Sequence, residues 1–457
     1  MQDNASPKKF RPYDPDAPLP MPVCLRDWLP EGHLVYLISD VVDTLDLSEI
    51  YAPYEEQLHG QPPYDPRLMV KLLFYAYTVG IPSSRRIEKK TYEDVAFRVL
   101  TVGQHPDHDT ICDFRKSHGK ALGRLFAHVL AICREAGLVK LGHVSFDGTK
   151  IKANASKHKA MSYARMVAKE AELEREVEEL LKKAQEEDDA EDARYGKGKR
   201  GDEVPKELQF KQKRLRTIRD AKARLEKRTR EHAIEEGKVH PDGTPKPTRG
   251  RAPKTPHGQP KPKDQENFTD PDSRIMVNGD KAFVQGYNAQ AAVDEASQII
   301  VGRSLTNEAN DKRQAQPLAE DVKANTGKTP GKVSADNGYF SEGNITYLQG
   351  QGIDPYIPAS RDKKLEATGP PRGRIPKGLS VEDRMRRKLR TKRGRGTYAK
   401  RKGIVEPVFG QIKFGRGLRQ FLLRGLENVA VEWDLWCIGH NLVKLWQSGW
   451  RVATQPI

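Results

Sequence analysis

Three carboxylates along the chain have the types and placement needed for metal-ion chemistry: Asp147, Asp336 and Glu406. Asp147 follows the alternating apolar run HVSF, and Asp336 follows the short β-prone run KVSA, so each is expected where a strand ends. Glu406 lies in KGIVEPVFGQIK, whose apolar residues have helical spacing. A helix packed across the two strand ends would bring all three carboxylates to one place.

Such carboxylates are the ligands that Mg²⁺ or Mn²⁺ prefers. Two of these ions, about 3.5–4 Å apart, activate a nucleophile and neutralise the charge that develops when a phosphodiester bond breaks. Three carboxylates shared between two ions are sufficient if the DNA phosphate completes the coordination shells. The sequence therefore predicts two-metal phosphodiester chemistry, with no need for ATP or a covalent enzyme intermediate.

Cysteine and histidine offer no competing metal site. The four cysteines show no CxxC spacing and are expected to be reduced and buried. They are Cys24, Cys112, Cys133 and Cys437. His143 and His158 have no second histidine at ligand spacing, so they are interpreted as structural or solvent-facing.

The charge of the chain points to a polyanionic partner. Its 457 residues carry 79 Lys and Arg against 63 Asp and Glu, a formal net charge of +16. No run of roughly 18 apolar residues is present, and the N-terminus is polar, so neither membrane insertion nor secretion is expected. Nucleic acid is the favoured partner.

The first third of the chain is predicted to be helical. A flexible segment, residues 1–22, precedes a helical DNA-binding domain at residues 23–138. Helical apolar spacing is found in segments 33–44, 66–79, 83–100 and 107–136. Arg85 and Arg86 near one helix start suit phosphate contact, and the alternative is a solvated charged face.

The remainder, residues 139–457, is predicted to be an α/β catalytic domain with an insertion at residues 160–265. An acidic helix and a basic helix in this insertion suggest an antiparallel hairpin. Seven prolines between Pro241 and Pro262 predict a mobile basic linker after it. Lys150 and Lys152, just after the first acid, could reach a phosphate.

After the insertion, the sequence predicts a β-hairpin with its turn at Asp294–Ser297. A helix from Asp311 to about Asn325, a strand ending at Asp336, a short helix and a strand near Pro355–Ile357 follow. Asn310 and Asp311 could line the site, but we interpret them as the start of that helix. The final helix, about Glu427–Trp446, is expected to pack on the sheet.

A very basic stretch precedes Glu406. Residues 384–402 contain eleven Lys and Arg, which suggests either a disordered tail or, as we prefer, a segment that follows DNA. It leads directly into the amphipathic helix, in which Pro407 is expected at the first turn.

The stretches FDGTKIKANASKHKAMSY, SADNGYF and YAKRKGIVEPVFGQIK together resemble the motifs of bacterial insertion-sequence transposases with a DDE triad. The resemblance extends from about Tyr64 to Trp446. A lone Asp-Gly is an ordinary turn signal, so only the set of motifs is specific. The resemblance implies an α/β fold with a ribonuclease H-like mixed sheet flanked by helices, an all-α N-terminal domain and an inserted charged helical hairpin.

The resemblance also implies roles for individual residues. In that family a lysine at the position of Lys413 contacts the transposon end, and Tyr398 and Arg401 correspond to phosphate contacts. Arg401 is one residue further from Glu406 than the family pattern has it. Glu406 and Lys413 are seven residues apart, two helical turns, and so should share one helix face.

The activity implied is cleavage at transposon ends followed by strand transfer of the 3′-hydroxyl into target DNA. The implied partners are the terminal inverted repeats and the target, both double-stranded, with a homodimer in the synaptic complex and a location in the bacterial cytoplasm at the nucleoid. Two alternatives remain: a ribonuclease H-like nuclease without strand transfer, and a catalytically silent DNA-binding protein derived from a transposase. The presence of all three acids weighs against the silent version.

Overall fold

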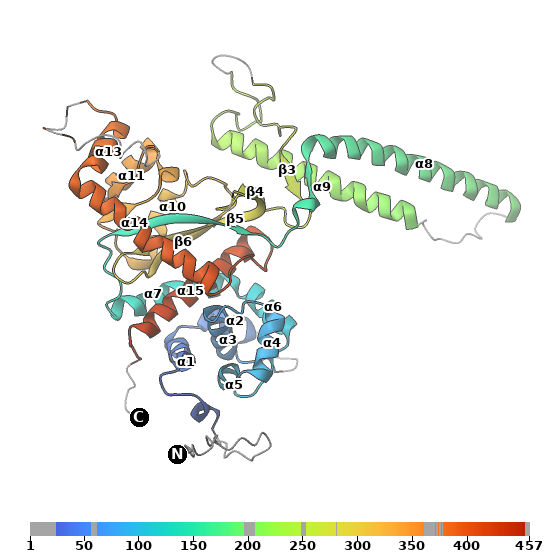
Figure 1. The fold of residues 1–457 in the computed structure, drawn as a ribbon. Helices are drawn as coiled ribbons and strands as arrows, with labels where there is room; N and C mark the ends of the chain where they lie inside the picture. The colour runs from blue at the N-terminus through green and yellow to red at the C-terminus, as the bar shows by residue number, and fades with distance from the viewer. Residues whose placement is uncertain are drawn as a thin grey trace, which may run out of the picture.

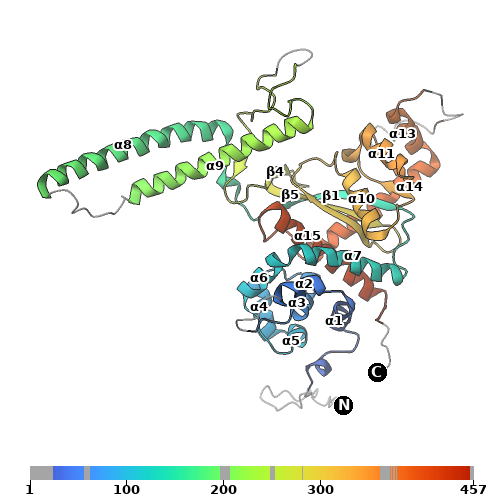
Figure 2. The same ribbon diagram turned by 180° about the vertical axis from the view of Figure 1, so that it is seen from behind.

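The computed structural model describes residues 24–55, 62–195, 206–247, 253–279, 281–360, 371, 373, 376 and 378–452. Figures 1 and 2 show a helical N-terminal part, an α/β part packed against it, and a long helical arm that projects from the α/β part. The N-terminal segment predicted to be flexible, residues 1–22, lies outside the described residues.

The helical part begins with a short turn, η1 (Leu25–Trp28). Its α-helices are α1 (Leu34–Thr44), α2 (Ser48–Glu55), α3 (Pro66–Thr78), α4 (Ser84–Glu93), α5 (Val95–Thr101), α6 (His108–Ser117) and α7 (Gly119–Glu135). Asp65 caps α3 by accepting the Arg67 N–H at 2.7 Å, and Pro66 takes the first helical position, where no N–H is needed. The predicted helical segments are confirmed, and two of them are each divided into two helices.

A six-stranded mixed sheet forms the centre of the α/β part. Its strands are β1 (Val144–Lys152), β4 (Arg274–Val277), β5 (Phe283–Asp294), β6 (Ile300–Thr306), β7 (Lys332–Ser334) and β8 (Asp354–Tyr356). The order is β4-β5-β1-β7-β8, with β6 also paired to β5. β5 runs antiparallel to β1, whereas β7 is parallel to β1 and β8 is parallel to β7. The predicted hairpin of β5 and β6 is confirmed.

Helices cover this sheet on both faces (Figure 2). They are α10 (Ala315–Thr326), α11 (Glu342–Gly350), α13 (Val381–Arg390), α14 (Lys392–Gly410) and α15 (Leu426–Gln447). A π-helical turn, η4 (Gln411–Gly415), continues α14. α10 packs against β6 and β5, and α14 packs across β1, β5, β7 and β8. The architecture is the ribonuclease H-like α/β fold that the sequence predicts.

The final helix joins the two parts. α15 packs on β6, as predicted, but it also packs on α7 and α3. Trp433 and Trp436 are fully buried along it, and the Trp436 ring makes an edge contact with Tyr77 of α3. At Gly439 a β-carbon would lie 3.1 Å from the backbone of Thr78, so this helix crossing needs a glycine.

The insertion forms the arm, which consists of α8 (Tyr163–Tyr195) and α9 (Lys206–Glu235). Glu170 pairs with Lys222, and Glu176 pairs with Lys211, so the helices run antiparallel, as predicted. Short strands β2 (Ala160–Ser162) and β3 (Gln265–Asn267) pair at its base. Apolar residues of both helices form a separate small core: Met166, Leu173, Val177, Leu208, Leu215, Ile218, Ala221 and Leu225.

Four local expectations are wrong. β1 does not end at Asp147, because β5 pairs with it as far as Lys152. α10 begins at Ala315, with Gln314 at its N-cap, so Asp311 does not start the helix. Pro407 lies deep inside α14, because the basic stretch before it is itself helical. Cys24 is exposed and Cys112 half-buried, whereas the other two cysteines are buried as expected.

The proline-rich stretch also differs from its prediction as a mobile linker. Residues 248–252 lie outside the described residues, but 241–247 and 253–262 are folded into turns. Val239 is buried, and its backbone bridges to Pro245. The buried Val239, just after α9, therefore holds part of this stretch in place, and the composition alone did not predict this contact. No helix in the described ranges is long and apolar enough to cross a membrane.

The close crossing of α15 and α3 gives a stability prediction. Gly439→Leu should lower the free energy of unfolding by about 1–3 kcal/mol, because its side chain overpacks against Thr78. Urea unfolding measures this, with Gly350→Ala as the control, since nothing lies within 4 Å of a β-carbon there. Equal stability of the two variants would contradict a tight crossing.

Candidate active site

Asp147, within β1, and Asp336, two residues after the end of β7, lie at the same level on neighbouring parallel strands. Ser145 of β1 is paired with Ser334 of β7, and each aspartate lies two residues further along its strand direction. The two serine hydroxyls are hydrogen-bonded at 2.7 Å, and His143 Nε2 lies 2.9 Å from the Ser334 hydroxyl. His143 is therefore a buried structural residue, as the sequence suggested, and the register brings the two carboxylates together.

Burial raises the pKa of the Asp147 carboxyl to about 7. The Arg401 guanidinium lowers this pKa in part, whereas the nearby charges of Asp336 and Asp311 raise it further. The Gly148 N–H donates to Asp147 Oδ1 at 2.9 Å. A carboxyl with a pKa near neutrality in a partly buried position is an indication of a functional site.

Asp336 also caps the turn η3 (Asn337–Tyr339), since its Oδ1 accepts the Gly338 N–H at 2.8 Å. Burial raises the pKa of Asp336, an effect that the Gly338 N–H partly offsets and that the charge of Asp311 increases. The sequence expectation that this aspartate follows a strand and precedes a turn agrees with the structure.

Glu406 lies on α14, which packs across β1 and β7. The Arg401 guanidinium links it to the first acid: Nη1 lies 3.4 Å from Asp147 Oδ2, and Nη2 lies 3.8 Å from Glu406 Oε1. Burial alone would lower the pKa of Arg401, but the charge of Asp147, followed by Tyr398 and the other two acids, makes the net shift upward. Arg401 is thus the positive centre of the acidic site.

The donor set fits hard divalent ions, since it consists of carboxylate oxygens. Within the described ranges, no group of three or more His, Cys, Asp or Glu side chains is already arranged to hold a metal ion. The Arg401 guanidinium contacts both Asp147 and Glu406 and provides positive charge between them. The Arg401 Nε is buried without a hydrogen-bond partner among the described residues, so its present contacts do not satisfy it fully.

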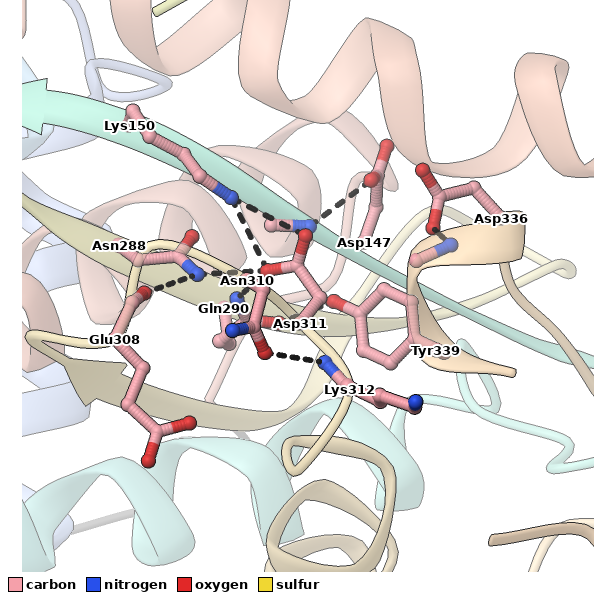
Figure 3. A network of polar contacts seen from close by, with 12 residues as sticks. Asp147, Lys150, Asn288, Gln290, Glu308, Asn310, Asp311, Lys312, Asp336 and Tyr339 are labelled. Carbon is pink, nitrogen blue, oxygen red and sulfur yellow. Dashed lines mark hydrogen bonds and ion pairs between the residues drawn. The ribbon is translucent and has the colours of Figure 1, made fainter. Parts of the chain in front are cut away.

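Figure 3 shows a polar network beside the two aspartates. Lys150, which we expected to reach phosphate, instead contacts Asp311 at 3.1 Å. The sequence allowed Asp311 either to line the site or to start a helix, and the helix start that we preferred is wrong because α10 begins only at Ala315, so its place in this network was not predicted. The signal that could have revealed it is the run YNAQAAV, in which Asn288 and Gln290 place amides on a strand that is otherwise apolar.

The remaining candidate DNA contacts of the α/β part lie on η4, α14 and β1. Lys413 lies on η4 and donates to Thr149 Oγ1 at 3.0 Å, two residues beyond Asp147 on β1. The Arg401 guanidinium lies 5.9 Å from the Tyr398 ring centre. Lys152 is exposed at the far end of β1.

Arg85 and Arg86 are exposed on the first turn of α4. Both views place α4 in the helical part, away from α14 (Figures 1 and 2). These two arginines are therefore not brought to the candidate site. His158 is exposed, as expected.

Two family models match the chain. Residues 23–117 match the transposase domain DUF772, and residues 242–442 match the transposase DDE domain. The second match includes Asp336 and Glu406 but begins after Asp147, because the arm separates β1 from the rest of the sheet. Comparison with curated proteins and with solved structures finds no match to the chain.

A helical transposase domain followed by an α/β DDE domain defines a DNA transposase. The chain belongs to the insertion-sequence transposases of the DDE type, with a ribonuclease H-like catalytic fold. Proteins of this family act on DNA and generally use divalent metal ions.

The raised pKa of Asp147 gives a prediction of stability against pH. Above pH 7 the folded protein carries a charge at the buried Asp147 carboxylate, which burial disfavours. Near pH 4 the folded carboxyl is neutral and the unfolded one is close to its own pKa of 3.8, so the two states differ little. Without metal, Asp147→Asn should therefore stabilise the protein at pH 8, on the order of 3 kcal/mol, and have little effect at pH 4.

Urea unfolding in EDTA at the two pH values measures this difference. Glu406→Gln is the control, because that side chain is 53% exposed and has little burial to relieve. Destabilisation by Asp147→Asn at pH 8, or an equal effect at both pH values, would count against a buried, costly charge.

Proposed function

We propose that this transposase cleaves DNA at the transposon ends and transfers the freed 3′-hydroxyl into target DNA, with Asp147, Asp336 and Glu406 as the ligands of two Mg²⁺ or Mn²⁺ ions. The main support is the register of β1 and β7, in which Asp147 of β1 and Asp336 just after β7 each follow the paired serines by two residues. α14 adds the glutamate across them, and Arg401 contacts both Asp147 and Glu406.

When bound, the two ions supply an activated nucleophile and neutralise the charge on the leaving oxygen. The protein supplies the orientation. Asp147 and Asp336 are held by short backbone hydrogen bonds from Gly148 and Gly338, so little ordering is left for ligand binding. Because the pKa of Asp147 is about 7, part of its carboxyl is protonated near neutral pH, and a bound cation would displace that proton and favour the carboxylate.

We further propose that Arg401 screens the negative charges of Asp147 and Glu406 from one another before DNA binds. Once DNA is bound, Arg401 would contact a DNA phosphate. Tyr398, next to it, and Lys413, on the Thr149 side of β1, would contact the transposon end. The exposed Lys152 and the basic face of α13 and α14 extend this surface along the DNA backbone.

The proposed division of labour follows the parts of the fold. Residues 23–138 would bind DNA through exposed side chains such as Arg85 and Arg86, and residues 139–457 would carry catalysis, with 160–265 as an insertion. The DNA partners would be the terminal inverted repeats and the target. Pairing of two ends implies a homodimer in the synaptic complex, acting in the bacterial cytoplasm at the nucleoid.

Removal of any one acid is expected to abolish strand cleavage. Asp147→Asn, Asp336→Asn and Glu406→Gln should each reduce cleavage of a labelled terminal oligonucleotide by at least about a thousandfold, while binding of that oligonucleotide is largely retained. Glu320→Gln, on the exposed side of α10, is the matched control and should cleave normally. Cleavage at the wild-type rate by one acid variant would remove that residue from the triad.

The same assay separates the alternatives. Joining of the labelled 3′ end to a target plasmid supports transposition, and cleavage without joining would identify a nuclease. Binding without either reaction would identify a silent DNA-binding protein.

Lys413 is expected to contribute to affinity and not to the chemical step. Lys413→Ala should weaken binding of the terminal oligonucleotide and reduce the slope of log affinity against log salt by about one. Fluorescence anisotropy at several salt concentrations measures both quantities. An unchanged salt slope would show that its contact with Thr149 is only structural.

A further inference from the structure

Asp311 is the hub of the polar network in Figure 3. Its Oδ1 accepts hydrogen bonds from Asn288 Nδ2 and Gln290 Nε2, both at 2.7 Å. Its Oδ2 accepts from Lys150 Nζ at 3.1 Å. The Lys150 and Asp311 side chains are only 15% and 14% exposed, so this ion pair is shielded from solvent. A carboxylate with this many short, partly buried contacts is held in one orientation.

The network connects the elements that carry the two aspartates. Lys150 is on β1, three residues after Asp147, and it is paired with Asn288 of β5 in the sheet. Gln290 of β5 uses its other amide atom, Oε1, to accept a hydrogen bond from the Tyr339 hydroxyl. Tyr339 is fully buried and lies on η3, the turn that Asp336 caps. Asp311 is therefore linked to the strand of Asp147 and to the turn of Asp336.

The glycine after Asp147 makes room for this network. A β-carbon at Gly148 would overlap Gln290 Nε2 and lie 2.8 Å from Asp311 Oδ1. At Gly338, two residues after Asp336, a β-carbon would lie 2.9 Å from Asp336 Oδ1, whereas its 3.5 Å distance to Asp311 Oδ2 is ordinary contact. The Asp-Gly motif, which in isolation reads as a turn signal, thus leaves space for the approach of Asp311.

The negative charge of Asp311 explains why the network contains Lys150. Asp311 adds a third negative charge close to Asp147 and Asp336, and a partly buried carboxylate needs a partner. Lys150 neutralises it, so the Asp311–Lys150 pair adds rigidity without adding net charge beside the acids.

Resting on the proposed function, we propose that Asp311 is a positioning residue for the metal site. Through Lys150 and Gln290 it fixes β1 and the η3 turn relative to one another, so that Asp147 and Asp336 face the same ions. Asp311 acts through these residues and is not itself a ligand.

Mn²⁺ binding to the full-length, DNA-free protein, measured by isothermal calorimetry, tests this role. Asp311→Asn and Lys150→Met should each weaken Mn²⁺ binding about tenfold. The double variant should bind Mn²⁺ no more weakly than the weaker of the two single variants, because both substitutions break the same Asp311–Lys150 ion pair. Glu308→Gln, an acid-to-amide change in the same loop, is the matched control and should bind as the wild type does.

A purely electrostatic role predicts a different pattern. Loss of the Lys150 charge would then tighten Mn²⁺ binding while loss of the Asp311 charge weakened it, and that result would overturn the proposal, as would unchanged binding in Asp311→Asn. If Asp311→Asn does not fold, Lys150→Met alone decides, because the two accounts give opposite signs. A wild-type protein that binds no Mn²⁺ either alone or with the terminal oligonucleotide bound would overturn the proposed function itself, and this inference with it.

Discussion

The parallel pairing of β1 with β7 is the constraint on which the site depends. Ser145 and Ser334 are neighbours in the ladder, so the aspartates two residues beyond them, one still within β1 and one just after β7, lie side by side. Two carboxylates held together in a partly buried place repel one another and lose hydration. The surrounding structure offsets this cost: Arg401 faces Asp147 from α14, and Lys150 neutralises the neighbouring Asp311.

The rest of the fold keeps that strand pairing in place. α14 crosses β1 and β7 from one side, and η4 after it brings Lys413 onto Thr149. α15 packs on β6 and on the helical part at once, so this buried helix holds the helical part against the sheet. The arm adds a separate core of its own and leaves the sheet intact, which explains how β1 can be separated in sequence from the strands it pairs with.

Local patterns in the sequence predicted the helices, the β5–β6 hairpin and the charged arm, because amphipathic spacing and turn residues act over short distances. Long-range pairing was not predictable in this way. β1 continues past Asp147 only because β5, from a distant part of the chain, pairs with it up to Lys152. The contact of Asp311 with Lys150 was not predicted for the same reason, since Lys150 precedes it by 161 residues. Glu406 was placed correctly on its helix, but Pro407 proved to be an interior residue of α14.

The most direct test of the account is a crystal structure of the transposase bound to a transposon-end duplex and Mn²⁺, with the ions located by anomalous scattering. The account predicts two ions about 3.5–4 Å apart, coordinated by Asp147, Asp336 and Glu406 next to the scissile phosphate. Ions bound by other residues, or a scissile phosphate placed away from these three acids, would contradict it.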